Sequence, residues 1–401
     1  MYNAHDTTAQ AVAMAYDNDT VSARLDAVID RWTGSDRIAG LAMHVTRQGR
    51  LVYRREAGLA DRERGRTVTG ETVFRLASLT KTIVAATALA LAEAGRLSLA
   101  DAVSDWLPDF RPTTATGLRP RISLHHLMTH TSGLGYDFLD DGGSPYAAAG
   151  IDQGLGDGSI SLEENLARLS ALPLFFAPGT QWRYSMSIDV LGAVIERAAD
   201  MPLPDAVARY VTRPLGMTDT SFAVPDATRL AAAYKDGPHG ALRMSEQGDS
   251  VPLGGGFGAV PARAANASAW PSGGAGMYGT ATDYLRFLEA VRTGGGPILG
   301  RRAAASIGRH AIDNLRAWTE GPGWGFGLGA AVLLDPAAAD TPQSAGTWQW
   351  GGVYGNHWFV DPGQELTVVV LTNTSVAGMS GAFPEELCKA LYAGIHSAAG
   401  R

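Results

Sequence analysis

The stretch SLTKTIVAATALALAEAG, residues 78–95, sets a serine and a lysine three positions apart at the start of an apolar helical run. Residues three apart on a helix share one face, so the Ser78 hydroxyl and the Lys81 amine can meet directly. A serine hydroxyl needs a base to become a nucleophile, and burial or a nearby cation would lower the lysine pKa from its usual value of about 10.4. The pair is therefore a candidate nucleophile and base. The alternative is a helix-capping Ser78 followed by a solvated Lys81.

Composition makes Lys81 unusual and excludes several classes of protein. The chain has 401 residues and 33 basic side chains, of which only Lys81, Lys235 and Lys389 are lysines. The formal net charge of -7 and the lack of a basic run argue against a nucleic-acid partner. The single cysteine, Cys388, excludes an intrachain disulfide and a multi-cysteine metal site, and a buried hydrophobic role is expected for it.

The N-terminal residues lack a basic region followed by an apolar run, so no signal peptide is predicted. No run of 18 apolar residues occurs, and we expect no transmembrane helix and no membrane partner. A cytoplasmic location is the prediction, and a secreted mature form is the alternative. The oligomeric state is left open.

Periodicity predicts the remaining elements outward from the Ser78 helix. Residues 1–20 form a loose polar arm, and residues 39–46 and 51–55 form a hairpin. Apolar residues at helical spacing predict helices over 21–32, 79–94, 162–172, 189–199, 203–211, 282–293 and 384–396. Late β-rich runs predict strands over 324–333, 348–352, 357–360 and 366–371.

These elements predict an α/β protein of the α+β type in two domains. Residues 1–95 and 276–401 form a domain with an antiparallel sheet flanked by helices, because the consecutive strands have short links. Residues 96–275 form a mainly helical domain with long Gly- and Asp-rich loops at 140–158 and 252–258. The active site is expected where the two domains meet.

Two further segments carry candidate functional groups. Tyr184 falls just before the 189–199 helix, where nearby cations would favour its phenolate and make it a general base; the alternative is a tyrosine packed in the helical domain. The run WQWGGVYG, residues 348–355, predicts a strand whose glycines let a ligand approach the backbone, and an edge strand there offers an N–H to an oxyanion. The alternative is a bulge with core tryptophans. We expect Trp182, Trp348 and Trp350 at the cleft.

Other signals are set aside. His126 and His130 are four apart, but no HExxH pattern and no third ligand accompany them, so no metal is predicted. The chain has no GxSxG nucleophile elbow and no GxGxxG turn between a strand and a helix, so neither an α/β-hydrolase triad nor a dinucleotide site is expected. We predict no cofactor.

The Ser78–Lys81 pair, Tyr184 and the Gly-rich run at 348–355 resemble, in order and spacing, the motifs of the penicillin-recognising serine hydrolases. The resemblance is greatest to the family VIII carboxylesterases, which look like class C β-lactamases. The resemblance covers about residues 22–395. Further matching stretches are LSLADAV at 97–103, LMTHTSG at 127–133, PLGM at 214–217, and GGAGM at 273–277 followed by TATD at 280–283.

The resemblance implies a β-lactamase/transpeptidase-like fold and a role for each site residue. Ser78 is the acylated nucleophile, and Lys81 and Tyr184 share its proton. The backbone N–H groups of Ser78 and Val353 form the oxyanion hole. Substrate-binding positions are Trp350, Gly351 and Gly352 on the Gly-rich strand, with Trp182 and Met186 around the tyrosine.

Two departures from the class C pattern favour esters over β-lactams. Met186 stands where those enzymes carry the Asn of Y-x-N, and Trp350-Gly351-Gly352 stands where they carry K-T-G. The resemblance therefore implies hydrolysis of small to medium carboxylic esters. The alternatives are an acyltransferase, a D-amino-acid amidase, an oligomer hydrolase, a weak β-lactamase, or a non-catalytic penicillin-binding receptor that is acylated once.

Overall fold

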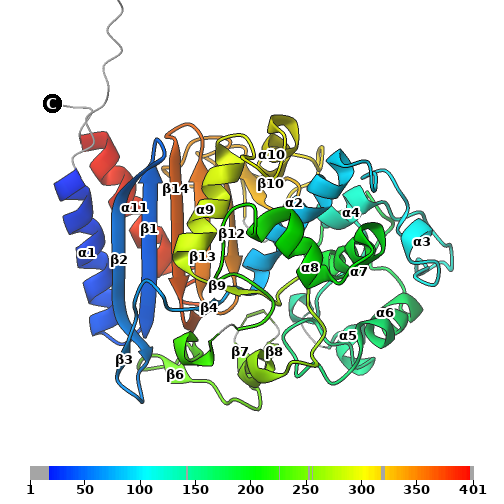
Figure 1. Ribbon diagram of the computed structural model, residues 1–401, viewed down its shortest axis with the longest axis horizontal. Helices are drawn as coiled ribbons and strands as arrows, with labels where there is room; N and C mark the ends of the chain where they lie inside the picture. The colour runs from blue at the N-terminus through cyan, green and yellow to red at the C-terminus, as the bar shows by residue number, and fades with distance from the viewer. Residues whose placement is uncertain are drawn as a thin grey trace, which may run out of the picture.

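The computed structural model describes residues 18–140, 143–224, 226–251, 253–254, 256–317 and 321–397. Residues 1–17 of the predicted arm lie outside this range, and residues 18–20 begin the first helix. Parts of the two predicted loops, at 141–142, 252 and 255, also lie outside it. Within the described residues, eight strands form one antiparallel sheet (Figure 1). Its order is β10 (Trp324–Phe326), β11 (Ala331–Leu333), β12 (Trp348–Gly352), β13 (Asn356–Asp361), β14 (Leu366–Thr372), β1 (Gly40–Arg47), β2 (Arg50–Asp61) and β3 (Arg66–Thr67).

The centre of the sheet joins the two ends of the chain. Strand β1 pairs antiparallel with β14 from Leu41↔Thr372 to Arg47↔Leu366, and with β2 through the predicted hairpin. Nearly every residue of β1 and β14 is buried, because helices cover both faces of this part of the sheet. The sheet is therefore complete only when strands from both ends of the chain are in place.

Two helical layers enclose the sheet. The helices α1 (Asn18–Gly34) and α11 (Ala382–Ser397) lie side by side against one face and share an apolar cluster with β1, β2 and β14 (Figure 1). On the other face, α9 (Ala281–Arg292) packs against β1 and β14. The predicted helices at both ends and the predicted fold class are confirmed.

The helical part of the molecule lies beside the sheet and surrounds α2 (Thr80–Glu93) (Figure 1). All residues of α2 from Thr80 to Leu91 are buried, as expected for a helix that is apolar on every side. The other helices here are α3 (Val103–Trp106), α4 (Leu124–Met128), α5 (Pro145–Ala148), α6 (Leu162–Ala171), α7 (Ser187–Ala199) and α8 (Leu203–Val207). Domain boundaries at 95/96 and 275/276 stay a prediction.

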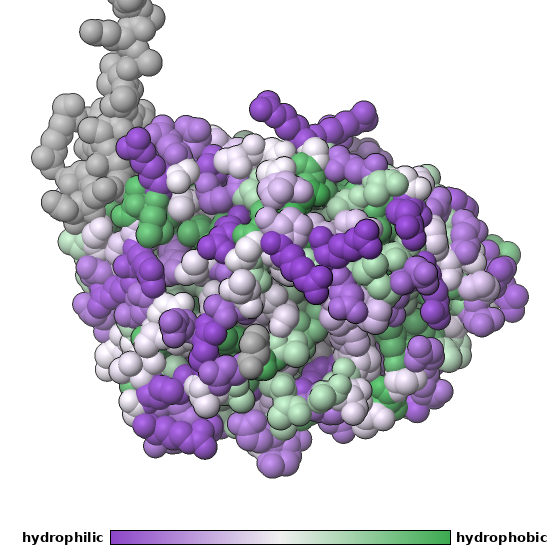
Figure 2. Space-filling model, in the orientation of Figure 1, coloured by the Kyte–Doolittle hydropathy of each residue, from purple (hydrophilic) through white to green (hydrophobic). Residues whose placement is uncertain are grey.

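Short elements that the periodicity did not predict complete the fold. The helix α10 (Arg301–Ile307) packs on α2 and α9. In the small sheets, β5 (Tyr234–Lys235) pairs with both β15 (Thr374–Ser375) and β6 (Leu242–Arg243), β4 (Phe74–Arg75) pairs with β9 (Tyr278–Gly279), and β7 (Asp249–Val251) pairs with β8 (Phe257–Ala259). On the face in Figure 2, hydrophilic side chains are interspersed with small apolar groups, as on an ordinary solvated surface.

Three predictions about individual elements were wrong. The run 324–333 is a hairpin of β10 and β11, because the chain turns at Gly329, whose positive φ of 102° favours glycine. The predicted helix over 203–211 is α8 followed by a π-helical turn, Ala208–Thr212. Ser78 lies in a 3-10 turn, Ala77–Leu79, and α2 begins after it at Thr80.

Strand β12 is not an edge strand, but its second half is paired on one side only, as in an edge strand. It lies between β11 and β13, but β11 pairs only with Trp348 and Gln349. From Trp350 to Gly352, β12 pairs with β13 alone among the described residues. The backbone on its other side therefore faces the turn that carries Ser78.

Candidate active site

The turn that carries Ser78 is strained and tightly held. Ala77 is buried and adopts a φ of 48°, a left-handed conformation that residues with a Cβ rarely take. Hydrogen bonds hold the turn from three sides: Leu76 N–H to the Met277 carbonyl at 2.9 Å, Met277 N–H to Thr80 Oγ1 at 3.1 Å, and the Tyr284 hydroxyl to the Leu79 carbonyl at 3.0 Å. Such strain persists only where the surroundings enforce it, and here it fixes the direction of Ser78.

Lys81 is buried directly below the serine. Its Nζ donates to Ser78 Oγ at 3.2 Å and to the Gly274 carbonyl at 2.7 Å, and it lies 4.6 Å from the centre of the Tyr184 ring. Burial lowers the pKa of Lys81 to about 7, and the charge of Asp189 opposes part of that shift. Since a neutral amine can accept a proton, Lys81 is suited to act as a base around neutral pH.

Lys81 is expected to titrate near pH 7, because burial makes its protonated form costly. Below its pKa of about 7 the amine is charged and cannot accept a proton; above it the amine is neutral. The chain has three lysines, so carbon-13 labelling of lysine Cε gives three NMR signals. The Lys81 signal should shift between about pH 6 and 8.

Lys235→Arg and Lys389→Arg assign the other two signals. Lys235 pairs with Asp249, and Lys389 is largely exposed. A Lys81 signal that shifts only around pH 10 contradicts the role of burial.

Asp189 positions the carbonyl that receives Lys81. From the first turn of α7, its Oδ1 accepts bonds from Ser272 Oγ at 2.5 Å and from the Gly274 N–H at 2.9 Å. These bonds hold the turn at 272–274 so that the Gly274 carbonyl meets Lys81. Sequence reasoning missed Asp189, although a carboxylate inside the apolar 187–199 run was a signal for it.

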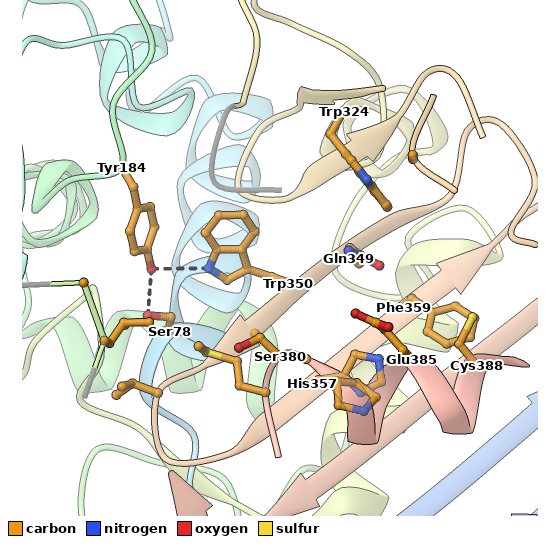
Figure 3. A pocket seen from close by; sticks show the side chains of 18 of the residues that line it. Ser78, Tyr184, Trp324, Gln349, Trp350, His357, Phe359, Ser380, Glu385 and Cys388 are labelled. Atoms are coloured by element: carbon orange, nitrogen blue, oxygen red, sulfur yellow. Dashed lines mark hydrogen bonds between the residues drawn. The ribbon is translucent and has the colours of Figure 1, made fainter. Parts of the chain in front are cut away.

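Tyr184 completes the group around Ser78. Its hydroxyl donates to Ser78 Oγ at 2.7 Å, and it accepts a bond from Trp350 Nε1 at 3.3 Å. The ring packs against His130 and Trp350 at centroid distances of 4.9 Å and 5.0 Å. The structure thus brings together Ser78, Lys81, Tyr184 and Trp350 from three separate segments, and Figure 3 shows Ser78, Tyr184 and Trp350 of this group.

The end of β12 packs on the serine turn because Gly352 has no side chain. A Cβ at Gly352 would lie 2.5 Å from the Leu76 carbonyl oxygen and 3.0 Å from Leu79 Cδ1. This contact brings Val353 to the site, where it lines the same cavity as Ser78. Neither the Ser78 nor the Val353 backbone N–H has an acceptor within the described chain. Both are therefore available to an oxyanion.

A cavity of about 810 Å³ opens in front of Ser78. The residues of the helical part that line it are mostly apolar: Tyr136, Phe138, Leu139, Leu155 and Leu253. Trp350 and Gly351 line it from β12. In Figure 3, Ser78, Tyr184 and Trp350 lie together at one end, while His357, Glu385 and Cys388 lie toward the other.

Several residues predicted at the cleft lie behind it. Trp182 is buried against His130 and Phe326, Trp348 packs on Trp358, and Met186 is buried at the start of α7. None of the three, nor Gly352, is on the cavity wall that the described residues form. Closeness in sequence to Tyr184 or Trp350 did not place these residues on the cavity wall, because neighbouring side chains point in different directions.

The two histidines four residues apart have separate structural contacts. His126 Nδ1 accepts the Ser123 N–H at 3.3 Å in the cap of α4, and buried His130 bonds Ser185 Oγ at 3.0 Å. The described residues contain no group of three or more His, Cys, Asp or Glu side chains that could hold a metal ion. In the same part of the chain, no helix is long and apolar enough to cross a membrane.

A half-buried serine in contact with a buried lysine and a buried tyrosine, beside two free backbone N–H groups, defines the chemistry of a serine acyl-transfer site. A family model described as Beta-lactamase matches residues 21–387, most of the chain. The protein therefore belongs to the β-lactamase family.

Individual relatives are similar over nearly their whole lengths. Esterase EstB of Burkholderia gladioli is 49% identical over 385 residues, which are 95% of this chain and 97% of the relative. The structure of EstCE1, described as a hydrolase with promiscuous acyltransferase activity, superposes with a TM-score of 0.90 at 42% identity, covering 94% of this chain and all of that one. A class C β-lactamase, with a TM-score of 0.67 at 19% identity over 95% of this chain and 97% of its own, shares the fold.

Proposed function

We propose that the protein is a serine carboxylesterase of the family VIII type. The observation that carries this proposal is the contact of Ser78 Oγ with both Lys81 Nζ and the Tyr184 hydroxyl at one end of the cavity. The 49% identity with a relative named as an esterase supports it. A cytoplasmic location stays a prediction.

In the proposed cycle, Ser78 Oγ attacks the ester carbonyl carbon while its proton passes to the Lys81–Tyr184 pair. The carbonyl oxygen becomes an oxyanion that accepts bonds from the N–H groups of Ser78 and Val353. When the intermediate collapses, the bond to the alcohol oxygen breaks and the alcohol leaves with a proton from that pair. Water then attacks the acyl-enzyme through the same steps and releases the carboxylic acid.

The cavity favours esters over β-lactams. Trp350 occupies the strand position at which a cation would bind a β-lactam carboxylate, and its indole N–H is directed to Tyr184. Lys389, the one cation on the cavity wall formed by the described residues, lies on α11 and is 4.0 Å from Glu385. Without that cation, the cavity lacks a charged hydrogen bond to the β-lactam carboxylate. The loss corresponds to a roughly tenfold to hundredfold lower rate of β-lactam opening.

Wild-type protein is expected to hydrolyse p-nitrophenyl butyrate with a kcat/KM at least about a hundredfold above that for opening a chromogenic cephalosporin. Both reactions are followed by absorbance under one set of conditions. A class C β-lactamase serves as the control with the opposite preference. Rapid opening of the β-lactam ring would instead place the protein with the lactamases.

Acyl transfer is the second candidate, because EstCE1, at 42% identity, is described as having promiscuous acyltransferase activity. Transfer requires an alcohol to outcompete water at the acyl-enzyme, and the apolar wall that the helical part contributes favours this. Analysis of products with added alcohol separates the two outcomes: an ester product supports transfer, and acid alone supports hydrolysis.

A further inference from the structure

The cavity continues from Ser78 onto the face of the sheet that α11 covers. Gln349 pairs with Phe359, and Gly351 pairs with His357, so these four residues point from one face of β12 and β13. Phe359 stacks on Tyr392 of α11, which identifies that face. All four line the cavity, and Figure 3 shows His357 and Gln349 well away from Ser78 along the strand.

We call this region, lined by Gln343, Gln349, His357 and the α11 residues Glu385 and Cys388, the distal arm. Four of these five residues carry polar side chains, beside the apolar Phe359, whereas the walls contributed by the helical part are mostly apolar. Thr341 Oγ1 donates to Gln343 Oε1 at 2.9 Å, and Gln343 Nε2 contacts Gln349 Oε1 at 3.5 Å. Amide groups are therefore already in place on one side of the arm.

His357 supplies the decisive observation. Its Nδ1 is buried and has no hydrogen-bond partner among the described residues. Native proteins rarely leave such an atom unsatisfied, so the ring keeps an unused hydrogen-bonding atom at the wall of the arm. Burial lowers the pKa of His357 to about 4, which leaves the ring neutral at pH 7 with one donor and one acceptor nitrogen.

We propose that the distal arm binds a neutral hydrogen-bonding group, a hydroxyl or an amide, at the far end of an elongated ester whose carbonyl lies at Ser78. The inference rests on the proposed esterase function and names its substrate class. A volume of about 810 Å³ lies in the upper part of the usual range of roughly 300–1,000 Å³ for ligand pockets. Asp340 and Glu385 outnumber Lys389 on the described wall, so the arm repels an anionic group, while the amides and the neutral His357 ring favour a hydrogen-bonding one.

The test compares esters that differ only at the distal tip. On the acyl side, p-nitrophenyl ω-hydroxyoctanoate is compared with p-nitrophenyl nonanoate; on the alcohol side, ω-hydroxyoctyl acetate is compared with nonyl acetate. His357→Phe keeps a ring of similar size but removes both nitrogens, and Gln349→Leu removes the amide. In one of the two series, each variant should lower the ratio of kcat/KM, hydroxyl over alkyl, about fivefold relative to wild type.

Two controls separate the arm from the catalytic machinery. Turnover of p-nitrophenyl acetate, too short to reach His357, should be unchanged in both variants and shows that they fold. His239→Phe, at an exposed position outside the cavity wall, should leave every ratio unchanged. If the ratios stay constant in both series while p-nitrophenyl acetate is hydrolysed, the proposed role of the distal arm is wrong and the esterase proposal is unaffected. If wild type fails to hydrolyse p-nitrophenyl acetate, the esterase proposal falls and the arm falls with it.

Discussion

Replacing Ser78 by alanine is expected to lower kcat for p-nitrophenyl butyrate by roughly 10⁴-fold or more. The change removes the single oxygen that contacts both Lys81 and Tyr184, and no acyl-enzyme can form without it. The turn itself should persist, because backbone bonds and its neighbours hold it rather than the serine side chain. Initial rates of p-nitrophenolate release measure the loss.

Mass spectrometry of the intact protein gives a second readout. Wild type quenched during turnover should carry one butyryl group, and Ser78→Ala should carry none. Ser245→Ala, at an exposed position, is the matched control and should retain full turnover. A Ser78→Ala protein that is still acylated would show that another residue is the nucleophile. Wild type that is acylated once without turnover would support the receptor alternative.

Tyr184→Phe is expected to lower kcat by roughly 10²–10⁴-fold with little change in KM. The ring contacts with His130 and Trp350 remain, so the fold should be unaffected. The hydroxyl that bridges Ser78 Oγ and the Trp350 indole is lost, and proton transfer to and from Ser78 loses one of its two groups. Steady-state kinetics with p-nitrophenyl butyrate separate kcat from KM.

The residual activity of Tyr184→Phe identifies the base. If Lys81 accepts the serine proton, the remaining rate should still rise with pH through about 7, where the amine becomes neutral. Tyr210→Phe, at a position outside the cavity wall, serves as the control for loss of a tyrosine hydroxyl. Undiminished kcat in Tyr184→Phe would mean that Lys81 suffices and that the tyrosine has no part in the reaction.

Local patterns predicted the parts of the site that lie close together in the sequence. The spacing of three residues placed Lys81 beneath Ser78, even though Ser78 occupies a 3-10 turn rather than the helix itself. The alternation and glycines of 348–352 predicted β12 with its bounds. Helical and strand periods are properties of short segments, so single-sequence reasoning reads them well.

Contacts between distant segments could not be predicted in the same way. Asp189 and Ser272 lie 83 positions apart, and nothing in either local pattern places them together. The partial pairing of β12 depends on where β11 begins, which the sequence of β12 does not specify. The burial of Trp182 and Met186 behind the cavity likewise follows from tertiary packing.

The dependence of the site on both ends of the chain has a use in the study of folding. Ser78 follows the first strands, whereas Val353 follows β12 and reaches the serine turn through the contact of Gly352 with Leu76. During synthesis or refolding, a chain can therefore contain its nucleophile long before it has a complete oxyanion site. An activity-based probe that reacts with Ser78 would label the chain only after β12 has packed against the serine turn. The rate of labelling would therefore measure the rate of this last step of folding.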